Sequence, residues 1–112
     1  MDLVERAKRT EKIRALNDEF RTNLGEGCIY LTEGVKSFHG ASEVLVKVFK
    51  FDAFTENNDP HGEHDFGAFE FRGERFMWKI DYYDTKVEFG SEDPADPEKT
   101  TRVLTVMLAS EY

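Results

Sequence analysis

The residues best suited to chemistry lie in the stretch NNDPHGEHDFG, residues 57–67. His61 and His64 are three residues apart among carboxylates, and such a mixture of nitrogen and oxygen ligands suits Zn²⁺, Mn²⁺ or Fe²⁺. In the specific zinc motifs, however, the two histidines lie on one rigid helix, whereas here Pro60 and Gly62 break any helix between them. The same groups could serve in general acid–base catalysis. A metal site would use His61, His64, Asp65 and Asp81.

A different interpretation treats this stretch as a tight turn that leads into a strand. The residues DPHG at 59–62 match a type I turn, with Asp first, Pro second and Gly fourth. His64 and Asp65 would then orient the start of the strand through side-chain hydrogen bonds. We favour this structural interpretation over a metal or acid–base site, so we expect no cofactor, with a divalent metal ion as the alternative.

A second acidic pair, Asp81 and Asp84, flanks two tyrosines farther along the chain. If a hairpin turns at Gly73, these carboxylates come near the same edge of the sheet as His64 and Asp65. Crowded carboxylates raise one another's pKa or bind a cation. Charges at strand ends are also ordinary solvated residues, and that alternative stays open.

The hairpin is the clearest β signal in the chain. It covers FGAFEFRGERFMWKIDYYD, residues 66–84, where alternate side chains of the second strand form an apolar side. Residues 72–74 would form the turn, because Gly73 can take a positive φ. KVEFG at 86–90 could add a third strand, and GSEDPADP at 90–97 indicates a loop. The apolar side would carry Phe76, Trp78, Ile80 and Tyr82.

The segment before the hairpin predicts a helix followed by a short strand. Residues 2–23 contain good helix formers and one apolar stripe. Gly25 and Gly27 would end that helix in a left-handed conformation. CIYL at 28–31 alternates as a short strand would.

Two further segments favour helices. Residues 41–54 fit a strand or a helix, but the spacing of Glu43 and Lys47 favours the helix. The chain from Pro97 onward predicts another helix, because Asp96 can cap it and the apolar residues share one face. Together the elements indicate an α+β fold: a small antiparallel sheet, made of a hairpin plus one or two strands, packs against helices.

The size and composition fit one domain. A chain of 112 residues with 39% hydrophobic residues is long enough for one core and too short for two, so we expect a single domain over residues 1–112. Cys28 is the only cysteine, so no disulfide can form within the chain. The opening residues lack the apolar core of a signal peptide, and no run of about 18 apolar residues occurs. We expect a cytoplasmic protein without a membrane partner.

The charge is concentrated in the second half of the chain. Residues 1–50 hold nine Lys/Arg and eight Asp/Glu, whereas residues 51–112 hold six and fifteen. A field of this sign repels nucleic acid and attracts cations or basic protein surfaces, so we expect no direct binding of DNA or RNA. The residues expected to form the acidic surface are Asp52, Glu56, Asp59, Glu63, Asp84, Glu88, Glu92, Asp93 and Asp96. The alternative is that this acidity serves solubility alone.

Three stretches together carry a resemblance to a known family: NDPHGEHDFG, WKIDYYD and GSEDPADPEKTTRVLTVMLASEY. From about residue 10 to residue 112 the chain resembles an uncharacterised family of small bacterial proteins, a domain of unknown function with the number 3768. The resemblance implies a bacterial cytoplasmic setting and an origin on mobile elements. It brings no activity, substrate or catalytic residue.

The interpretation favoured on these grounds is a binding protein that presents its acidic surface to a basic protein partner. An anti-defence inhibitor that blocks a CRISPR or restriction complex by mimicking nucleic acid is the concrete version. The alternative is a metal-binding protein or metal-dependent enzyme built on the histidine stretch. The chain would be a monomer, or a homodimer joined through an aromatic sheet face with Phe69, Phe71, Met77 and Tyr83.

Overall fold

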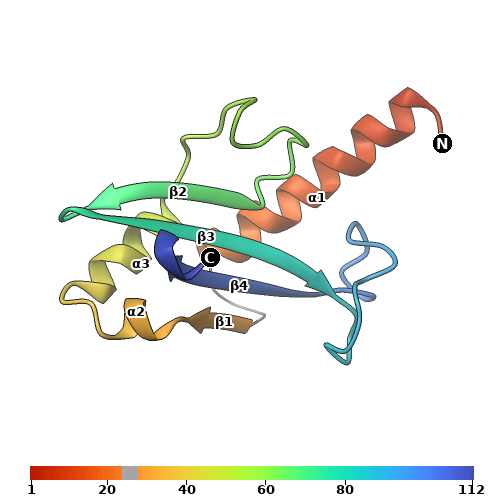
Figure 1. Cartoon of the computed structure of the whole chain (residues 1–112). Coiled ribbons are helices and arrows are strands. Elements are labelled where there is room, and N and C mark those ends of the chain that lie inside the picture. The colour runs from red at the N-terminus through yellow and green to blue at the C-terminus, as the bar shows by residue number, and fades with distance from the viewer. Residues whose placement is uncertain (24–27) are drawn as a thin grey trace.

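The computed structural model describes residues 1–23 and 28–112, and Figure 1 shows the path of the chain. A long helix opens the chain, two short helices follow, and three of the four strands come after them. The elements are α1 (Leu3–Asn23), β1 (Cys28–Leu31), α2 (Glu33–Lys36), α3 (Ala41–Phe49), β2 (Phe66–Phe71), β3 (Glu74–Tyr83), β4 (Thr101–Leu108) and the short 3-10 helix η1 (Ala109–Glu111).

The four strands form one sheet in the order β1-β4-β3-β2. β2 and β3 form the predicted hairpin, whose turn at Arg72 and Gly73 has φ values of 51° and 81°. β3 also pairs with β4 in antiparallel fashion, whereas β1 runs parallel to β4 with Cys28 opposite Val103. The predicted α+β fold is therefore confirmed, and the sheet is mostly antiparallel but mixed because of β1.

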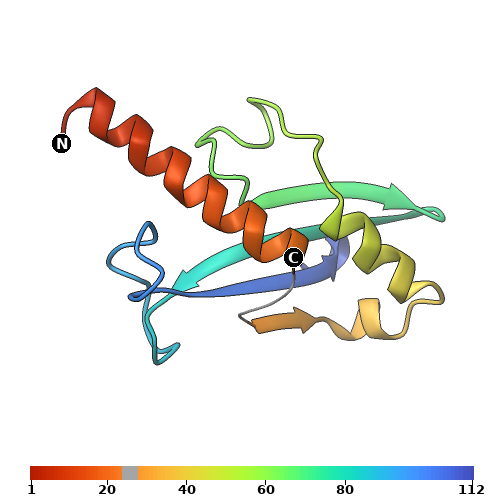
Figure 2. The ribbon, with the colours of Figure 1, turned by 180° about the vertical axis from the view of Figure 1, so that it is seen from behind.

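Helices cover one face of this sheet. Figure 2 shows α1 and α3 in front of the strands, whereas η1 lies on the opposite side. Phe76, Trp78 and Ile80 point toward α1 and α3 and are at most 3% exposed, as the alternation in the sequence predicts. The core contains Val35, Val44, Val48, Phe76, Trp78, Ile80, Leu104 and Val106.

The residues suggested for a dimer interface divide between the two faces of the sheet. Phe69 lies opposite Phe76 in the hairpin, so it belongs to the face that the helices cover, and Phe71 shares that face. Met77 and Tyr83 point to the opposite face, because they alternate with the buried residues of β3. These four side chains do not form one patch.

The C-terminal segment is a strand, so the prediction of a helix from Pro97 onward is wrong. β4 lies between β1 and β3, and its side chains are buried on both faces of the sheet. Leu104 and Val106 face the helices, and Val103 and Met107 face the other way. A central strand therefore has a nearly continuous apolar run, which also matches one face of a helix.

Two other boundaries differ from the predictions. Residues 86–90 form no strand and instead belong to a turn that closes with an isolated bridge between Tyr83 and Gly90. α3 ends at Phe49 rather than Phe54, because Phe51 and Phe54 pack edge-on against Trp78 with ring centroids 5.6 and 6.2 Å away. The predicted helix stop at Gly25 and Gly27 falls outside the described residues.

Trp78 is the largest side chain of the core and needs a glycine beside it. A Cβ atom at Gly67 would clash with the indole ring, so the absence of a side chain there lets Trp78 lie against β2.

Among the described helices, none is both long enough and apolar enough to cross a membrane.

Candidate functional site

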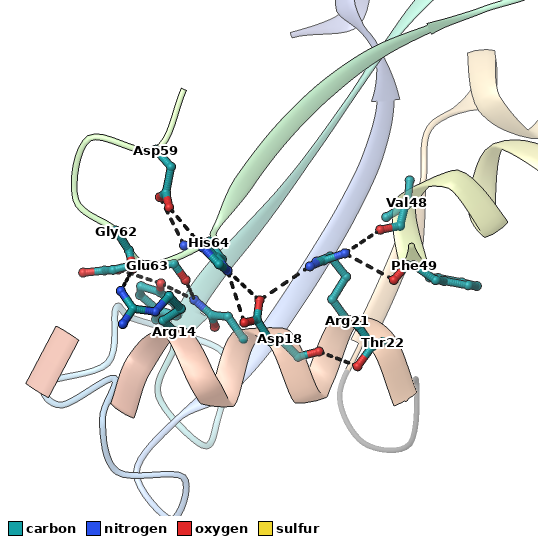
Figure 3. Close-up of polar contacts among 12 residues, drawn as sticks. Arg14, Asp18, Arg21, Thr22, Val48, Phe49, Asp59, Gly62, Glu63 and His64 are labelled. Atoms are coloured by element: carbon teal, nitrogen blue, oxygen red, sulfur yellow. Dashed lines mark hydrogen bonds and ion pairs between the residues drawn. The ribbon is translucent and has the colours of Figure 1, made fainter. Parts of the chain in front are cut away.

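His64 lies where the loop between α3 and β2, residues 50–65, crosses α1 (Figure 3). Its ring stacks on Phe54, with centroids 3.7 Å apart and the planes within 4° of each other. Nδ1 lies 2.9 Å from Asp18 Oδ1 of α1, and because a carboxylate only accepts, this nitrogen carries the proton. Nε2 lies 3.6 Å from Asp59 Oδ2, which is too far for a hydrogen bond.

The turn before His64 forms as the sequence predicts. The Gly62 amide donates to the Asp59 carbonyl at 3.1 Å, which is the bond that closes a β-turn. The Asp59 carboxylate accepts from the His64 amide at 3.1 Å and is almost entirely buried. Arg14 of α1 donates to the Gly62 carbonyl at 2.9 Å, so this hydrogen bond attaches the turn to the helix.

The four predicted metal ligands do not come together. His61 is exposed, and the two ring nitrogens of His64 point in opposite directions toward two different carboxylates. Asp81 lies on the sheet face opposite the helices, where it accepts a 2.7 Å hydrogen bond from Lys79. Over residues 1–23 and 28–112, no group of three or more His, Cys, Asp or Glu side chains has an arrangement that could hold a metal ion.

Asp65 lies at the entry to β2, and its carbonyl accepts a 2.8 Å hydrogen bond from Ile80. Burial raises the pKa of the Asp65 carboxyl above its ordinary value, and the nearby negative charge of Glu63 raises it further. The predicted proximity of Asp65 and Asp81 along the hairpin is confirmed, but Asp81 points to the other face of the sheet.

A buried polar network lies beside His64 and joins α1 to the sheet. Asn17 is fully buried, and its amide donates to the Tyr82 hydroxyl at 2.8 Å and to the Glu63 carbonyl at 2.9 Å. Arg102 of β4 donates from Nε to Asn17 Oδ1 at 2.6 Å. Tyr82 donates to the Glu63 carboxylate at 2.7 Å, and burial together with this bond raises the pKa of Tyr82. The network satisfies groups that would be costly to bury alone.

Arg21 is the second buried cation of this region. Its Nη1 donates to the Val48 and Phe49 carbonyls at 2.8 and 3.3 Å, and thereby satisfies the C-terminal end of α3. The guanidinium lies 4.9 Å from the centroid of Trp78, and burial lowers the pKa of Arg21. Its Nε has no hydrogen-bond partner within the described part of the chain.

Asn17, Arg21 and Arg102 are functional positions of this region that were not predicted from the sequence. A signal was present for α1, since Ile13, Asn17 and Arg21 follow one another at intervals of four residues and share its buried stripe. Arg102 had no comparable signal, because its segment was assigned to a helix.

A groove runs beside this cluster, between the end of α1 and the end of α3. Its volume is about 760 Å³ and its floor is largely apolar, with Phe49, Phe51 and Phe54. Asp18, Arg21 and His64 lie along its wall. Because Asp18 accepts a hydrogen bond from the His64 ring and Asp59 accepts one from the His64 amide, the cluster fixes the loop to α1.

The acidic residues of the α3–β2 loop fall into two classes. Asp59 and Glu63 point inward, where they accept hydrogen bonds from the His64 amide and the Tyr82 hydroxyl. Asp52 and Glu56 are exposed to solvent. Half of the acidic residues predicted for this loop therefore serve the interior.

The loop between β3 and β4, residues 84–100, keeps more of its charge outside. Glu88 and Glu92 are exposed, and Glu92 lies 3.6 Å from Lys99. Glu98 is exposed as well, and the other three acidic residues organise the loop while remaining partly exposed. Asp84 accepts from the Lys86 and Glu88 amides, Asp93 from Arg9 and the Ala95 amide, and Asp96 from the Glu98 amide.

Backbone amides, above all that of Glu88, lower the pKa of Asp84. Asp84 therefore keeps its charge to lower pH than an ordinary aspartate does. Together with Asp52 and Glu56, the exposed groups Glu88 and Glu92 are the part of the predicted acidic surface that faces solvent most fully.

The comparison with protein families matches residues 9–111 to a family with the description "protein of unknown function (DUF3768)". The chain belongs to this family, which confirms the resemblance of its motifs. Neither the curated proteins nor the solved structures give a match. The family description assigns no activity, so the function must be argued from the molecule itself.

Proposed function

We propose that this protein works by binding a basic surface on a partner protein, and that its outward-facing carboxylates make the contact. The observation that carries the proposal is the composition of the β3–β4 loop. Between Asp84 and Glu98 it holds six carboxylates and a single lysine, Lys86. Opposite charges attract over about 8 Å at physiological salt, so such a loop guides a basic partner toward it.

The hydrogen bonds of this loop support the proposal. Asp84, Asp93 and Asp96 hold backbone amides, so the loop has a defined shape before any partner arrives. A preformed loop loses less conformational entropy on binding than a flexible one. The exposed carboxylates of Glu88 and Glu92 therefore lie on a loop whose backbone is already ordered.

The finer version of the proposal is an anti-defence inhibitor. A protein that occupies the cationic groove of a CRISPR or restriction complex would compete with the phosphates of DNA. The net charge of −8 and its concentration after residue 50 support this version.

The test uses a variant that removes four exposed negative charges: Asp52→Asn, Glu56→Gln, Glu88→Gln and Glu92→Gln. The matched control removes four exposed charges elsewhere: Glu11→Gln, Glu19→Gln, Glu33→Gln and Glu74→Gln. Glu33 lies 3.8 Å from Lys36, so the control also loses one weak surface ion pair, as the first variant does.

Each protein is immobilised and exposed to bacterial lysate, and the retained proteins are quantified by mass spectrometry at about 50 and about 300 mM NaCl. We expect the unmodified protein and the control to retain a common partner at low salt, and the first variant to lose at least about tenfold of it. Retention that is equal for all three proteins, or insensitive to salt, would refute the proposal. Competition between the protein and DNA for a purified partner then tests the inhibitor version.

A further inference from the structure

The turn that follows β3, residues 84–90, exposes two apolar side chains at its tip. Phe89 is 73% exposed and Val87 is 43% exposed. Figures 1 and 2 show this turn beyond the end of the sheet, away from α1 and α3. Large apolar groups that remain in water gain free energy when another surface covers them, at about 25 cal/mol for each Å².

Hydrogen bonds hold the backbone of the turn that carries these two side chains. Asp84 Oδ1 accepts from the amides of Lys86 and Glu88 at 3.2 and 3.0 Å. The Asp84 amide donates to the Phe89 carbonyl at 2.8 Å, and the Val87 amide donates to the Asp84 carbonyl at 3.0 Å. Phe89 therefore belongs to a turn whose backbone is closed by these hydrogen bonds.

The backbone at Val87 is strained. Its φ is 56°, in the left-handed region that a β-branched residue rarely adopts. Such a conformation costs about 1–3 kcal/mol and persists only where the surroundings impose it. Val87 is nonetheless 43% exposed. The turn therefore keeps a strained conformation that leaves an apolar side chain partly exposed on the surface.

We infer that residues 84–90 are the anchor of a protein–protein interface, with Phe89 and Val87 inserted into an apolar pocket on a partner protein. The inference rests on the proposed binding function, for which it names the point of contact. Aromatic side chains are enriched in interfaces, where a few of them supply most of the binding free energy. Because carboxylates surround the turn, the residues around the partner's pocket must be complementary in charge, which means Lys or Arg side chains.

A second copy of this chain fits the turn poorly. Two copies that met through this end would bring together two loops with six carboxylates each between Asp84 and Glu98. Like charges held this close repel one another. The occupant is therefore a different protein of opposite charge.

The test is site-specific photocrosslinking of the full chain in the organism that encodes it. p-Benzoylphenylalanine replaces Phe89 in one protein, Glu92 in a second and Leu3 in a third, where Leu3 is an exposed apolar control at 81% exposure. We expect a crosslinked partner protein from position 89, in at least about tenfold greater yield than from position 3. Combining the position 89 probe with Asp52→Asn, Glu56→Gln and Glu92→Gln should reduce that yield.

The outcomes separate this inference from the proposed function. Crosslinks from position 92 with none from position 89 would refute the anchoring role of Phe89 and would leave the proposed binding through the acidic surface standing. Crosslinks from position 89 that survive the loss of the carboxylates would support the anchoring role of Phe89 and refute the proposal that charge attraction brings the partner. Crosslinks only to a second copy, or none from either position, would overturn the inference. As a check on folding, Phe89→Ser should leave the midpoint of urea unfolding unchanged.

Discussion

The two acidic loops of this protein use their carboxylates in opposite ways. In the α3–β2 loop, Asp59 and Glu63 point inward and hold the His64 amide and the Tyr82 hydroxyl. In the β3–β4 loop, Glu88 and Glu92 point outward, and Phe89 is exposed between them. Both loops contribute equally to a net charge calculated from the sequence, but only in the second is every carboxylate at least partly exposed.

This difference predicts where substitutions will affect stability and where they will affect binding. The α3–β2 loop depends on buried hydrogen bonds, whose loss exposes the full desolvation cost of the groups left unpaired. The β3–β4 loop is ordered by the carboxylates of Asp84, Asp93 and Asp96, so its exposed glutamates can change with little effect on unfolding.

The largest effect should come from Asn17→Leu. The substitution removes the acceptor of Arg102 Nε and the donor to Tyr82 and the Glu63 carbonyl. A buried guanidinium without its acceptor costs about 2–4 kcal/mol of the free energy of unfolding. Urea denaturation followed by circular dichroism measures this loss. The control is Asn57→Leu in the exposed part of the loop, and equal midpoints for the two variants would show that the network contributes nothing to stability.

An intermediate effect is expected for His64→Ala. This change removes the stack on Phe54 and the contact with Asp18, and we expect a loss of about 1–2 kcal/mol. His61→Ala is a matched control in the same loop, because His61 is exposed, and should cost less than about 0.5 kcal/mol. The two unfolding curves are compared at pH 7. If both variants unfold alike, His64 does not fasten the loop to α1.

The smallest effect, and one of opposite sign, is expected for Asp65→Asn. Because the pKa of Asp65 is raised in the folded state, folding favours its protonated form, and the charged form at pH 7 destabilises the protein. The amide should therefore stabilise the protein by about 0.5 kcal/mol at pH 7. The gain should disappear as the pH falls below about 3.9, where the unfolded chain is protonated too. A loss of stability at pH 7 would contradict this reasoning.

The sequence predicted elements whose signals are local. The alternation of Phe76, Trp78 and Ile80 identified the hairpin and its buried face, and Gly73 identified the turn. β4 was missed because a strand buried on both faces has no alternation for the sequence to reveal. Its place beside β1 depends on a pairing between Cys28 and Val103, far apart along the chain.

The site was predicted only in part for a related reason. The turn at residues 59–62 follows from the local preferences of Asp, Pro and Gly. The bond from His64 to Asp18 crosses 46 residues, and the bond from Arg102 to Asn17 crosses 85. Residue spacing does not predict contacts between residues so far apart in the sequence. Only the folded structure shows which carboxylates point inward and which face solvent.

The order of the strands also sets the order of assembly. β2, β3 and β4 follow one another along the chain as antiparallel neighbours, so their pairing closes shorter loops than the pairing of β1 with β4 does, and we expect this meander to form early. β1 is four residues long and must find β4 across most of the sequence, with Cys28 opposite Val103. Closing so long a loop costs entropy before any contact offsets it. We therefore expect the attachment of β1 to be the late step of folding, and β1 to be the first strand to separate when the sheet opens.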